Sequence, residues 1–185
     1  MKIKETTLKG VIIIEKDIFK DHRGFFMETY KQTQYEKAGI CDQFVQDNIS
    51  FSDKNTLRGL HYQSKHPQAK LVQAITGKIY DVAVDIRPSS PNFGKWIGVY
   101  LSGEQGNQLF IPKGFAHGFC VLSPEAHILY KCSEIYHPED DRGILWSDPE
   151  IGIDWPVKNP NLSDKDKAHK CINKILPGEL PREKG

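Results

Sequence analysis

The sequence lacks the features that would tie it to nucleic acid, to a membrane or to export. Its 25 basic and 24 acidic residues leave a formal net charge of +1, and it has no long basic run, which argues against nucleic acid as a principal partner. No apolar stretch approaches the length that spans a bilayer. Residues 1–5 lack the apolar core of a signal peptide. We therefore expect a cytoplasmic protein with neither nucleic-acid nor membrane partners.

Cysteine is also scarce, and the four cysteines form no C-x-x-C pair. A cysteine-ligated zinc site is therefore not expected, whereas reduced thiols are. Cys120 and Cys132 lie in apolar runs and are interpreted as buried packing residues. At 185 residues, the chain is expected to form a single domain over 1–185, with a core that needs neither disulfides nor a structural metal.

Helical signals are few, with one short helix predicted over 33–38, and strand signals dominate. Runs bounded by Gly and Pro predict strands over 71–75, 79–86, 96–101, 108–111, 118–122 and 127–132. Residues 76–78 indicate a hairpin between the first two, and alternation in 79–86 makes one face of that strand apolar. This pattern is typical of a β-sandwich or barrel. The barrel core is expected over about 40–156, followed by a C-terminal tail of loops and turns over 157–185.

The stretch from Arg58 to Lys70 places a guanidinium, the His61 imidazole and an ammonium near one another between two strand-like runs. Histidine is the side chain best suited to moving a proton near neutral pH. A nearby ammonium stabilises the oxyanion that forms when a proton leaves the carbon beside a carbonyl. The stretch therefore indicates proton-abstraction chemistry. In the alternative interpretation, Arg58 and Lys70 are solvated and His61 is a hydrogen-bonded core histidine.

Gly106 and the run from Pro112 to His117 match the second cupin signature, G-x5-P-x-G-x2-H. In that signature, proline and glycine shape a turn between two strands and the histidine points into a barrel. The first cupin signature, H-x-H followed by Glu, is absent, because His61 is followed by Tyr62-Gln63. Two histidines on adjacent strands would still be able to hold a metal, but without a further ligand in register none is expected. His117 is otherwise interpreted as a supporting or core histidine.

Two polar pairs lie on strand-like segments before Arg58. Arg23 and Glu28 are either an exposed ion pair or contacts to a phosphate and to a hydroxyl or ring N–H of a ligand. Gln46 and Asn48 fall on one side of a strand, where they either recognise a polar ligand or form a surface ladder.

Two tyrosines and one helix start in the C-terminal part of the chain each admit a structural and a catalytic interpretation. Tyr130 and Tyr136 flank the end of a predicted strand and are either structural or, inside a cavity, able to donate a proton opposite a base. Ser163 predicts a helix N-cap. The segment 162–166 is either an ordinary helix start, or one of its two aspartates orients His61 and stabilises its protonated form.

Taken together, these segments resemble the dTDP-4-dehydrorhamnose 3,5-epimerase family over about residues 10–166. Ten matches in order are far more specific than any single one. They are D-x-R-G-F-F-x-E at 21–28, Q-x-N at 46–48, R-G-L-H at 58–61, Lys70, G-x-I-x-D-V-x-V-D-I-R at 77–87, P-x-G-x-A-H-G-F at 112–119, Y-K-C at 130–132, D-P at 148–149, I-D-W-P at 153–156 and L-S-x-K-D at 162–166.

The resemblance implies an all-β, cupin-like jelly-roll fold with a few short helices, a homodimer, and catalysis with neither metal nor organic cofactor. The substrate would be dTDP-4-dehydro-6-deoxy-D-glucose, converted to dTDP-4-dehydro-L-rhamnose, the precursor of dTDP-L-rhamnose. By the resemblance, His61 is the base and Asp166 orients it. Lys70 would stabilise the enolate, and Tyr130 would donate the proton on the opposite face.

The resemblance also implies a set of residues that bind the substrate. Arg58 and His117 would contact its sugar and diphosphate side, and Tyr136 would stack on the thymine. The nucleotide-binding residues, on first strands exchanged across the dimer, are Arg23, Phe26 and Glu28. The remaining ligand contacts are Gln46, Asn48, Lys165 and Asp141, the last standing where some family members carry Glu.

Three alternatives stay open. Some family members invert only C3 or only C5, and the presence of Tyr130 does not fix how many centres are inverted. A metal-dependent cupin enzyme is disfavoured by the incomplete first signature. A non-catalytic sugar-nucleotide-binding module is disfavoured because a binder needs no base and acid on opposite faces of the ligand.

Overall fold

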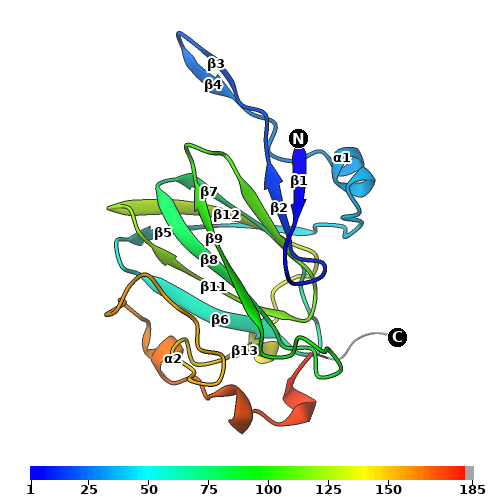
Figure 1. The fold of residues 1–185 in the computed structure, drawn as a ribbon, viewed down its shortest axis with the longest axis vertical. Coiled ribbons are helices and arrows are strands. Elements are labelled where there is room, and N and C mark those ends of the chain that lie inside the picture. Colours follow the sequence, from blue (N-terminus) through cyan, green and yellow to red (C-terminus); the bar gives the residue numbers. More distant parts are fainter. Residues whose placement is uncertain (182–185) are drawn as a thin grey trace.

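The computed structural model describes residues 1–181, and its two main sheets are antiparallel throughout (Figure 1). The larger sheet has the strand order β1-β2-β10-β7-β12-β5. Its strands are β1 Lys2–Glu5, β2 Ile12–Glu15, β10 Gln108–Ile111, β7 Lys70–Thr76, β12 Glu125–Cys132 and β5 Gln46–Asp53. The smaller sheet, β13-β6-β11-β8-β9, comprises β13 Asp141–Gly143, β6 Leu57–Gln63, β11 Phe115–Val121, β8 Lys78–Asp85 and β9 Trp96–Ser102. The expected all-β architecture is confirmed.

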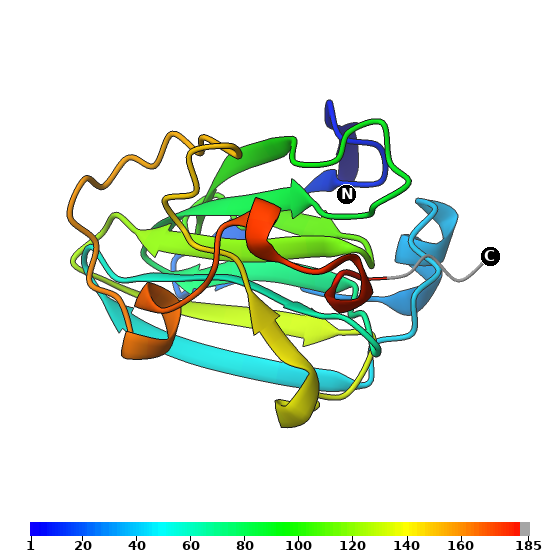
Figure 2. The same cartoon turned by 90° about the horizontal axis from the view of Figure 1, so that it is seen from below.

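An apolar core fills the space between the two sheets. Its members come from both inner faces, with Val72 and Ile128 on the larger sheet and Ala83 and Phe119 on the smaller one. Because side chains alternate along a strand, each core position is followed by a residue that faces outward. The two sheets therefore form the layers of a jelly roll, seen edge-on in Figure 2.

The outer face of the smaller sheet is covered by the C-terminal part of the chain (Figures 1 and 2). Trp155, Ile172 and Leu180 pack there against Val82 and Val84 of β8. This covering segment contains α2 Asp164–Lys167 and two 3-10 helices, η2 Ile172–Lys174 and η3 Pro177–Glu179. The prediction that the tail consists of short turns packed on the body is confirmed for the part of the tail up to residue 181.

Two strand predictions change in detail. The break at residues 76–78 is not a hairpin, because β7 pairs with β10 and β12 whereas β8 pairs with β11 and β9. The chain crosses from one sheet to the other at Gly77, which has a positive φ of 76°. The apolar face predicted for β8 packs under the C-terminal tail, and the opposite face is buried as well, including Asp81 and Asp85.

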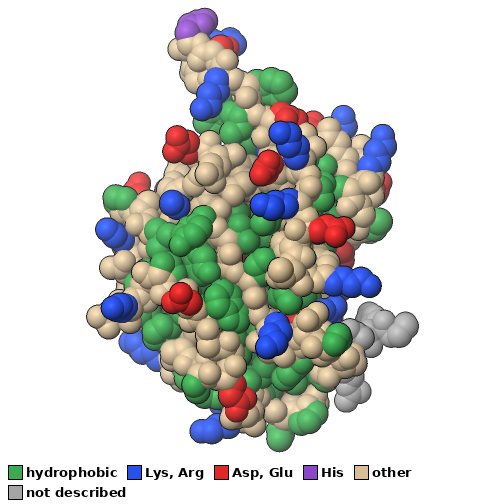
Figure 3. Space-filling view, viewed as in Figure 1, with side chains coloured by type: hydrophobic (Ala, Val, Ile, Leu, Met, Phe, Trp, Pro, Cys, Tyr) green, Lys and Arg blue, Asp and Glu red, His purple; other side chains and the backbone are tan. Residues whose placement is uncertain are grey.

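Two N-terminal elements lie outside the sandwich. Helix α1 Gln32–Lys37 buries Tyr35 against the outer face of the larger sheet, which confirms the short helix predicted at 33–38. Strands β3 Phe19–Asp21 and β4 Gly24–Phe26 form a separate hairpin that stands out from the body (Figures 1 and 3). Strand β2 pairs with β10 of the same chain, so the larger sheet begins before residue 40. No helix within residues 1–181 is long and apolar enough to cross a membrane.

Candidate active site

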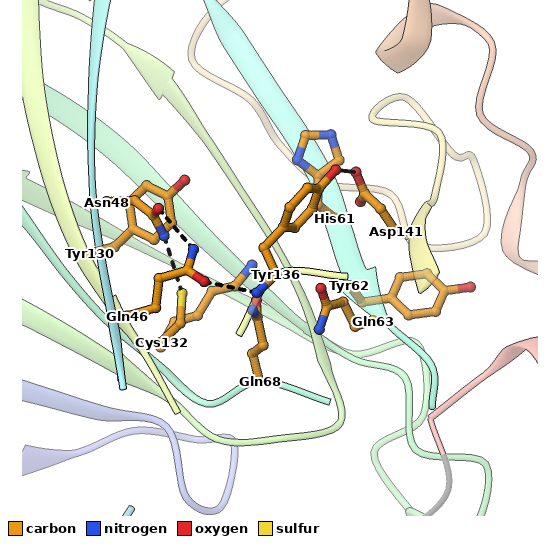
Figure 4. A pocket seen from close by; sticks show the side chains of 11 residues that line it. Gln46, Asn48, His61, Tyr62, Gln63, Gln68, Tyr130, Cys132, Tyr136 and Asp141 are labelled. Carbon is orange, nitrogen blue, oxygen red and sulfur yellow. Dashed lines mark hydrogen bonds between the residues drawn. The ribbon is translucent and has the colours of Figure 1, made fainter. Parts of the chain in front are cut away.

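One cavity lies between the inner faces of the two sheets, near the ends of β5, β6, β7 and β12 (Figure 4). It encloses about 260 Å³, close to the lower end of the range of small-molecule sites in proteins. Its lining residues are Gln46, Asn48, His61, Tyr62, Gln63, Gln68, Lys70, Tyr130, Cys132, Tyr136 and Asp141. The structure thus brings into one cavity seven residues that the sequence predicted for the site.

His61 is held from behind by a carboxylate. Its Nε2 lies 2.5 Å from Oδ1 of Asp166, which comes from α2 although 105 positions separate the two residues. Asp166 is buried, whereas about a third of the His61 side chain is exposed. Ser163 caps α2 by accepting a hydrogen bond from the Asp166 backbone N–H at 3.1 Å, which confirms the predicted N-cap. The orienting role of Asp166 toward His61 stays a prediction.

Glycines explain how His61 reaches this position. A Cβ on Gly59 would lie 2.5 Å from Cα of Gly118, so the close approach of β6 and β11 requires glycine. The register of the two strands shifts just after His117, and His117 pairs directly with His61. The glycines of the R-G-L-H and H-G-F motifs therefore let β6 and β11 come close enough to place His61 and His117 side by side.

Burial and ion pairing have opposite effects on the pKa values of His61 and Asp166. Desolvation lowers the pKa of His61, and this outweighs the opposing effect of the Asp166 carboxylate. Burial alone would raise the pKa of Asp166, but the neighbouring His169 and His61 lower it well below its usual range. As expected, Asp166 raises the pKa of His61, but the lowering by burial is larger. His61 is therefore neutral at neutral pH.

Lys70 and Tyr130 line the cavity from adjacent strands of the larger sheet. Desolvation lowers the pKa of Lys70, against the raising effect of Cys132, Asp141 and other acidic neighbours. Desolvation also raises the pKa of Tyr130, so its phenol keeps its proton at neutral pH. A lysine amine, a protonated phenol and a neutral imidazole therefore line the same cavity.

Amide side chains line the same side of the cavity as Tyr130 (Figure 4). Gln46 donates to Oδ1 of Asn48 at 3.0 Å and accepts from the backbone N–H of Tyr136 at 2.8 Å. Asn48 donates to Sγ of Cys132 at 3.7 Å. The prediction that Gln46 and Asn48 share one side of a strand is confirmed, and that side faces the cavity rather than solvent.

The rim carries a three-residue polar chain. The Tyr136 hydroxyl donates to Oδ2 of Asp141 at 2.8 Å, and the Lys165 ammonium donates to the same carboxylate. Burial alone would raise the pKa of Asp141, but the hydrogen bonds from Lys165 and Tyr136 lower it below its ordinary value. Asp141 is therefore an anion that links the mouth of the cavity to α2.

Two predicted contact residues do not line the cavity. Nε2 of His117 is bonded to the carboxylate of Asp81 at 2.9 Å, and both side chains are buried. Arg58 donates to Oγ of Ser52 at 3.0 Å and to the backbone carbonyl of Phe51 at 3.2 Å. His117 is the direct strand partner of His61, and Arg58, which is exposed, lies near enough to Tyr130 to lower the pKa of its phenol.

The predicted nucleotide-binding residues of the N-terminal segment are separate from this cavity. Arg23 and Phe26 belong to the projecting β3–β4 hairpin, where Phe26 is exposed. Arg23 is paired with Asp21 at 2.6 Å, so the suggested ion pair between Arg23 and Glu28 is wrong. Glu28 lies beyond the hairpin, close enough to Lys16 to raise the pKa of that lysine.

Four lining residues were missed from the sequence: Tyr62, Gln63, Gln68 and Cys132. Alternation along the strands would have found two of them, because Gln63 follows His61 by two positions and Cys132 follows Tyr130 by two. Cys132 is buried as predicted, yet it lines the cavity. His169 was also missed, and it forms with His61 and Asp166 a group whose ligand atoms all lie within 4.8 Å of one another.

Comparison with known proteins gives consistent matches along the chain. A family model described as dTDP-4-dehydrorhamnose 3,5-epimerase matches residues 5–174. The chain is 56% identical to a dTDP-4-dehydrorhamnose 3,5-epimerase of Shigella flexneri over 168 residues, which cover 90% of this chain and 93% of that protein.

Solved structures match equally well. The structure of a dTDP-6-deoxy-D-glucose-3,5-epimerase from Legionella pneumophila, in complex with dTDP-4-keto-L-rhamnose, has a TM-score of 0.96 and 51% identity, covering 100% of this chain and 99% of that one. The 3'-monoepimerase ChmJ of Streptomyces bikiniensis, in complex with dTDP-quinovose, has a TM-score of 0.89 and 31% identity, covering 96% of this chain and 91% of that one.

Proposed function

The chain belongs to the dTDP-4-dehydrorhamnose 3,5-epimerase family, and we propose that His61, Lys70 and Tyr130 carry out its proton transfers. It is an isomerase that converts dTDP-4-dehydro-6-deoxy-D-glucose to dTDP-4-dehydro-L-rhamnose in dTDP-L-rhamnose biosynthesis. One observation supports the proposed roles above all others. The three side chains line one cavity, and Asp166 bonds His61 from behind.

His61 is the base in this proposal. The C4 ketone acidifies the hydrogens on C3 and C5, because loss of either gives an enolate delocalised onto O4. Asp166 occupies Nε2 of His61, so the other ring nitrogen is left to take the proton. The lowered pKa of His61 keeps the imidazole neutral before the step, and Asp166 stabilises the imidazolium after it.

Lys70 and Tyr130 complete the cycle. The Lys70 ammonium stabilises the negative charge on O4. Tyr130 then gives its phenolic proton to the face opposite His61, so the carbon inverts. The raised pKa of Tyr130 suits this donor role, because the phenol is protonated at working pH. His61 then loses its proton to solvent and Tyr130 regains one from solvent, and repeating the cycle at the second carbon inverts that centre. None of these steps requires a metal or an organic cofactor.

Substrate binding is proposed for the polar residues around the cavity. Gln46 and Asn48 line it beside Tyr130, and Tyr136 at the mouth offers a ring on which the thymine stacks. Asp141 and Lys165 hold Tyr136 in place and add polar contacts at the rim. Of the two predicted contacts that do not line the cavity, Arg58 is proposed for the sugar and diphosphate side, whereas His117 is enclosed against Asp81 and is given no contact with the substrate.

We propose a homodimer in which the β3–β4 hairpin reaches the partner's cavity. Within the described chain this hairpin pairs with no other strand, and Phe25 and Phe26 are exposed on it. Arg23, Phe26 and Glu28 would then bind the nucleotide of the neighbouring site. A cytoplasmic location and the lack of nucleic-acid and membrane partners also stay predictions.

Exchange with solvent tests the reaction. In D₂O, NMR of the sugar nucleotide should show deuterium entering at both C3 and C5, and a reductase that uses NADPH should trap the L-rhamno product. Label at one carbon only would support a single-centre epimerase, whose fold the ChmJ match shows to be closely similar. Binding of the nucleotide with no label at either carbon would overturn the epimerase assignment in favour of a binding module.

Tyr130→Phe separates the two halves of the cycle. Removing the phenol leaves His61 able to take and return a proton on one face, so exchange should continue while inversion falls by about 10²-fold or more. Tyr100→Phe is the matched control, because Tyr100 is half-exposed on β9 and lines no part of the cavity. Equal losses of exchange and inversion in Tyr130→Phe would count against the donor role.

A mixing experiment tests the hairpin exchange. Chains with Arg23→Ala and chains with His61→Ala should each be impaired as separate dimers. If the hairpin serves the partner's site, a mixed dimer contains one site with both residues intact, and activity should partly return on mixing. If Arg23 serves its own chain, no mixed dimer has an intact site, and mixing should restore nothing.

A further inference from the structure

We propose that a divalent transition metal ion, for which Zn²⁺ is the probe, binds His61, Asp166 and His169 and thereby switches the epimerase off. The inference rests on the proposed function in one respect, namely that His61 is the base. It concerns a nitrogen, Nε2 of His169, for which the proton-transfer cycle has no use.

His169 is aimed at the catalytic pair. Its Nε2 lies 3.5 Å from Oδ1 of Asp166, and its ring meets the His61 ring edge-on with centroids 5.7 Å apart. Gly143 makes room for it, since a Cβ there would overlap the His169 ring. Apart from this long contact with Asp166, which lowers the pKa of that carboxyl, the buried Nε2 has no hydrogen-bond partner within residues 1–181, and buried polar atoms without a good partner are rare enough in folded proteins to call for an explanation.

The donor set suits zinc. Two imidazoles and one carboxylate, with a fourth position left open, form a common three-ligand zinc site. Tetrahedral bonds of about 2.0 Å place neighbouring ligand atoms about 3.3 Å apart. The His169–Asp166 distance of 3.5 Å already matches that spacing, and the His61–Asp166 distance of 2.5 Å has to open by less than about 1 Å.

Metal binding would remove the base without unfolding the site. In the active form Nε2 of neutral His61 carries the hydrogen donated to Asp166. A metal on Nε2 requires that proton to leave to solvent, and the neutral ring then takes a proton from solvent on its other nitrogen. The number of protons on the ring is unchanged, but the nitrogen facing the substrate is now a donor and is unable to accept a proton from carbon.

The ion is expected to reach His169 without crossing the substrate cavity. His169 lines a second hollow on the outer side, together with Gly143 and Lys170, while His61 lines the substrate cavity. The two hollows share Tyr62 and Asp141. Zinc bound from the His169 side should therefore lower turnover with little effect on substrate affinity.

The test measures turnover against ZnCl₂ concentration, with EDTA reversal, and measures zinc binding to the substrate-free protein by calorimetry. The wild-type chain should lose activity at least tenfold and bind one zinc per chain, and EDTA should restore turnover. His169→Phe keeps a ring against His61 but removes the ligand nitrogen. It should raise the half-inhibitory zinc concentration more than about tenfold, because even a change behind a metal ligand costs about 10–100-fold in affinity.

His66→Phe is the matched control. His66 and His137 stack with centroids 3.9 Å apart, so they are the rival pair of imidazoles for zinc on the described chain. Inhibition that persists in His66→Phe and is lost in His169→Phe supports the proposed site, and the reverse overturns it. The proposal is also overturned if the wild-type chain binds no zinc, or if zinc inhibits the wild type and both variants equally. Calorimetry judges the metal site even if the untreated enzyme shows no turnover, an outcome that would instead refute the proposed function.

Discussion

Two histidine–aspartate pairs lie next to each other, with both histidines in the smaller sheet, and they differ mainly in what surrounds them. His61 and His117 are direct partners across β6 and β11. Each has a carboxylate on Nε2, from Asp166 at 2.5 Å and from Asp81 at 2.9 Å. The side chain of His61 is 32% exposed and faces the cavity, whereas that of His117 is 7% exposed and is sealed in the sheet.

The comparison shows that the surroundings of a histidine–aspartate pair, and not its functional groups alone, decide what the pair does. The same two functional groups support proton transfer only where the second ring nitrogen meets open space that a substrate fills. Where the pair is enclosed, the buried carboxylate and the imidazole satisfy each other, and their value is structural. We therefore expect changes at His61 and Asp166 to appear in turnover and changes at His117 and Asp81 to appear in stability.

The largest expected effect comes from His61→Asn. Removing the base should lower kcat by about 10²–10⁴-fold with little change in thermal stability, since the ring borders the cavity. His117→Asn is the paired control and should show the opposite pattern, with the larger loss in melting temperature. If His117→Asn lowers turnover as strongly as His61→Asn while the fold survives, His117 acts on the substrate directly and the comparison fails.

Asp166→Asn should have the next largest effect, with kcat down by about 10²-fold or more, because the tautomer of His61 is no longer fixed.

The pH dependence of turnover tests the same pair in a second way. Burial lowers the pKa of His61, so kcat/KM of the wild-type chain should fall only as pH drops below the ordinary histidine value of about 6.5. Asp166 opposes that lowering, so its loss should move the acid limb to still lower pH. If the acid limb of the pH profile is unchanged in Asp166→Asn, Asp166 does not influence the pKa of His61.

Asp81→Asn sharpens the comparison from the structural side. Replacing one partner of a buried hydrogen-bonded pair typically costs about 1–3 kcal/mol, which urea unfolding would measure. Turnover per folded molecule should stay within about tenfold of the wild type, because Asp81 does not line the cavity. A kcat loss as large as that of Asp166→Asn, with stability unchanged, would show that the two pairs share one role.

Much of this arrangement was predictable from the sequence, because periodicity and short motifs are local. Alternating strands and the turn before His117 gave the layers and put that histidine inside the sandwich. The turn at Gly77 was misjudged because turn residues signal a reversal but not the sheet that receives the next strand. His169 was not recognised, because only the folded chain brings a residue after α2 against Gly143 in β13.

The smallest effect tests how rigidly the chain holds Asp166. Ser163 accepts from the Asp166 backbone N–H at 3.1 Å and caps a helix of four residues. Ser163→Ala should cost about 1 kcal/mol in stability. Turnover should fall by less than about tenfold, since 1.4 kcal/mol corresponds to tenfold. Ser123→Ala is the control, because Ser123 accepts from Lys78 N–H at 2.8 Å and has no contact with α2. If both variants lose stability but only Ser163→Ala loses turnover, the cap positions the carboxylate. If Ser163→Ala and Ser123→Ala have equal turnover, contacts with His61 and His169 hold Asp166 in place without the Ser163 cap.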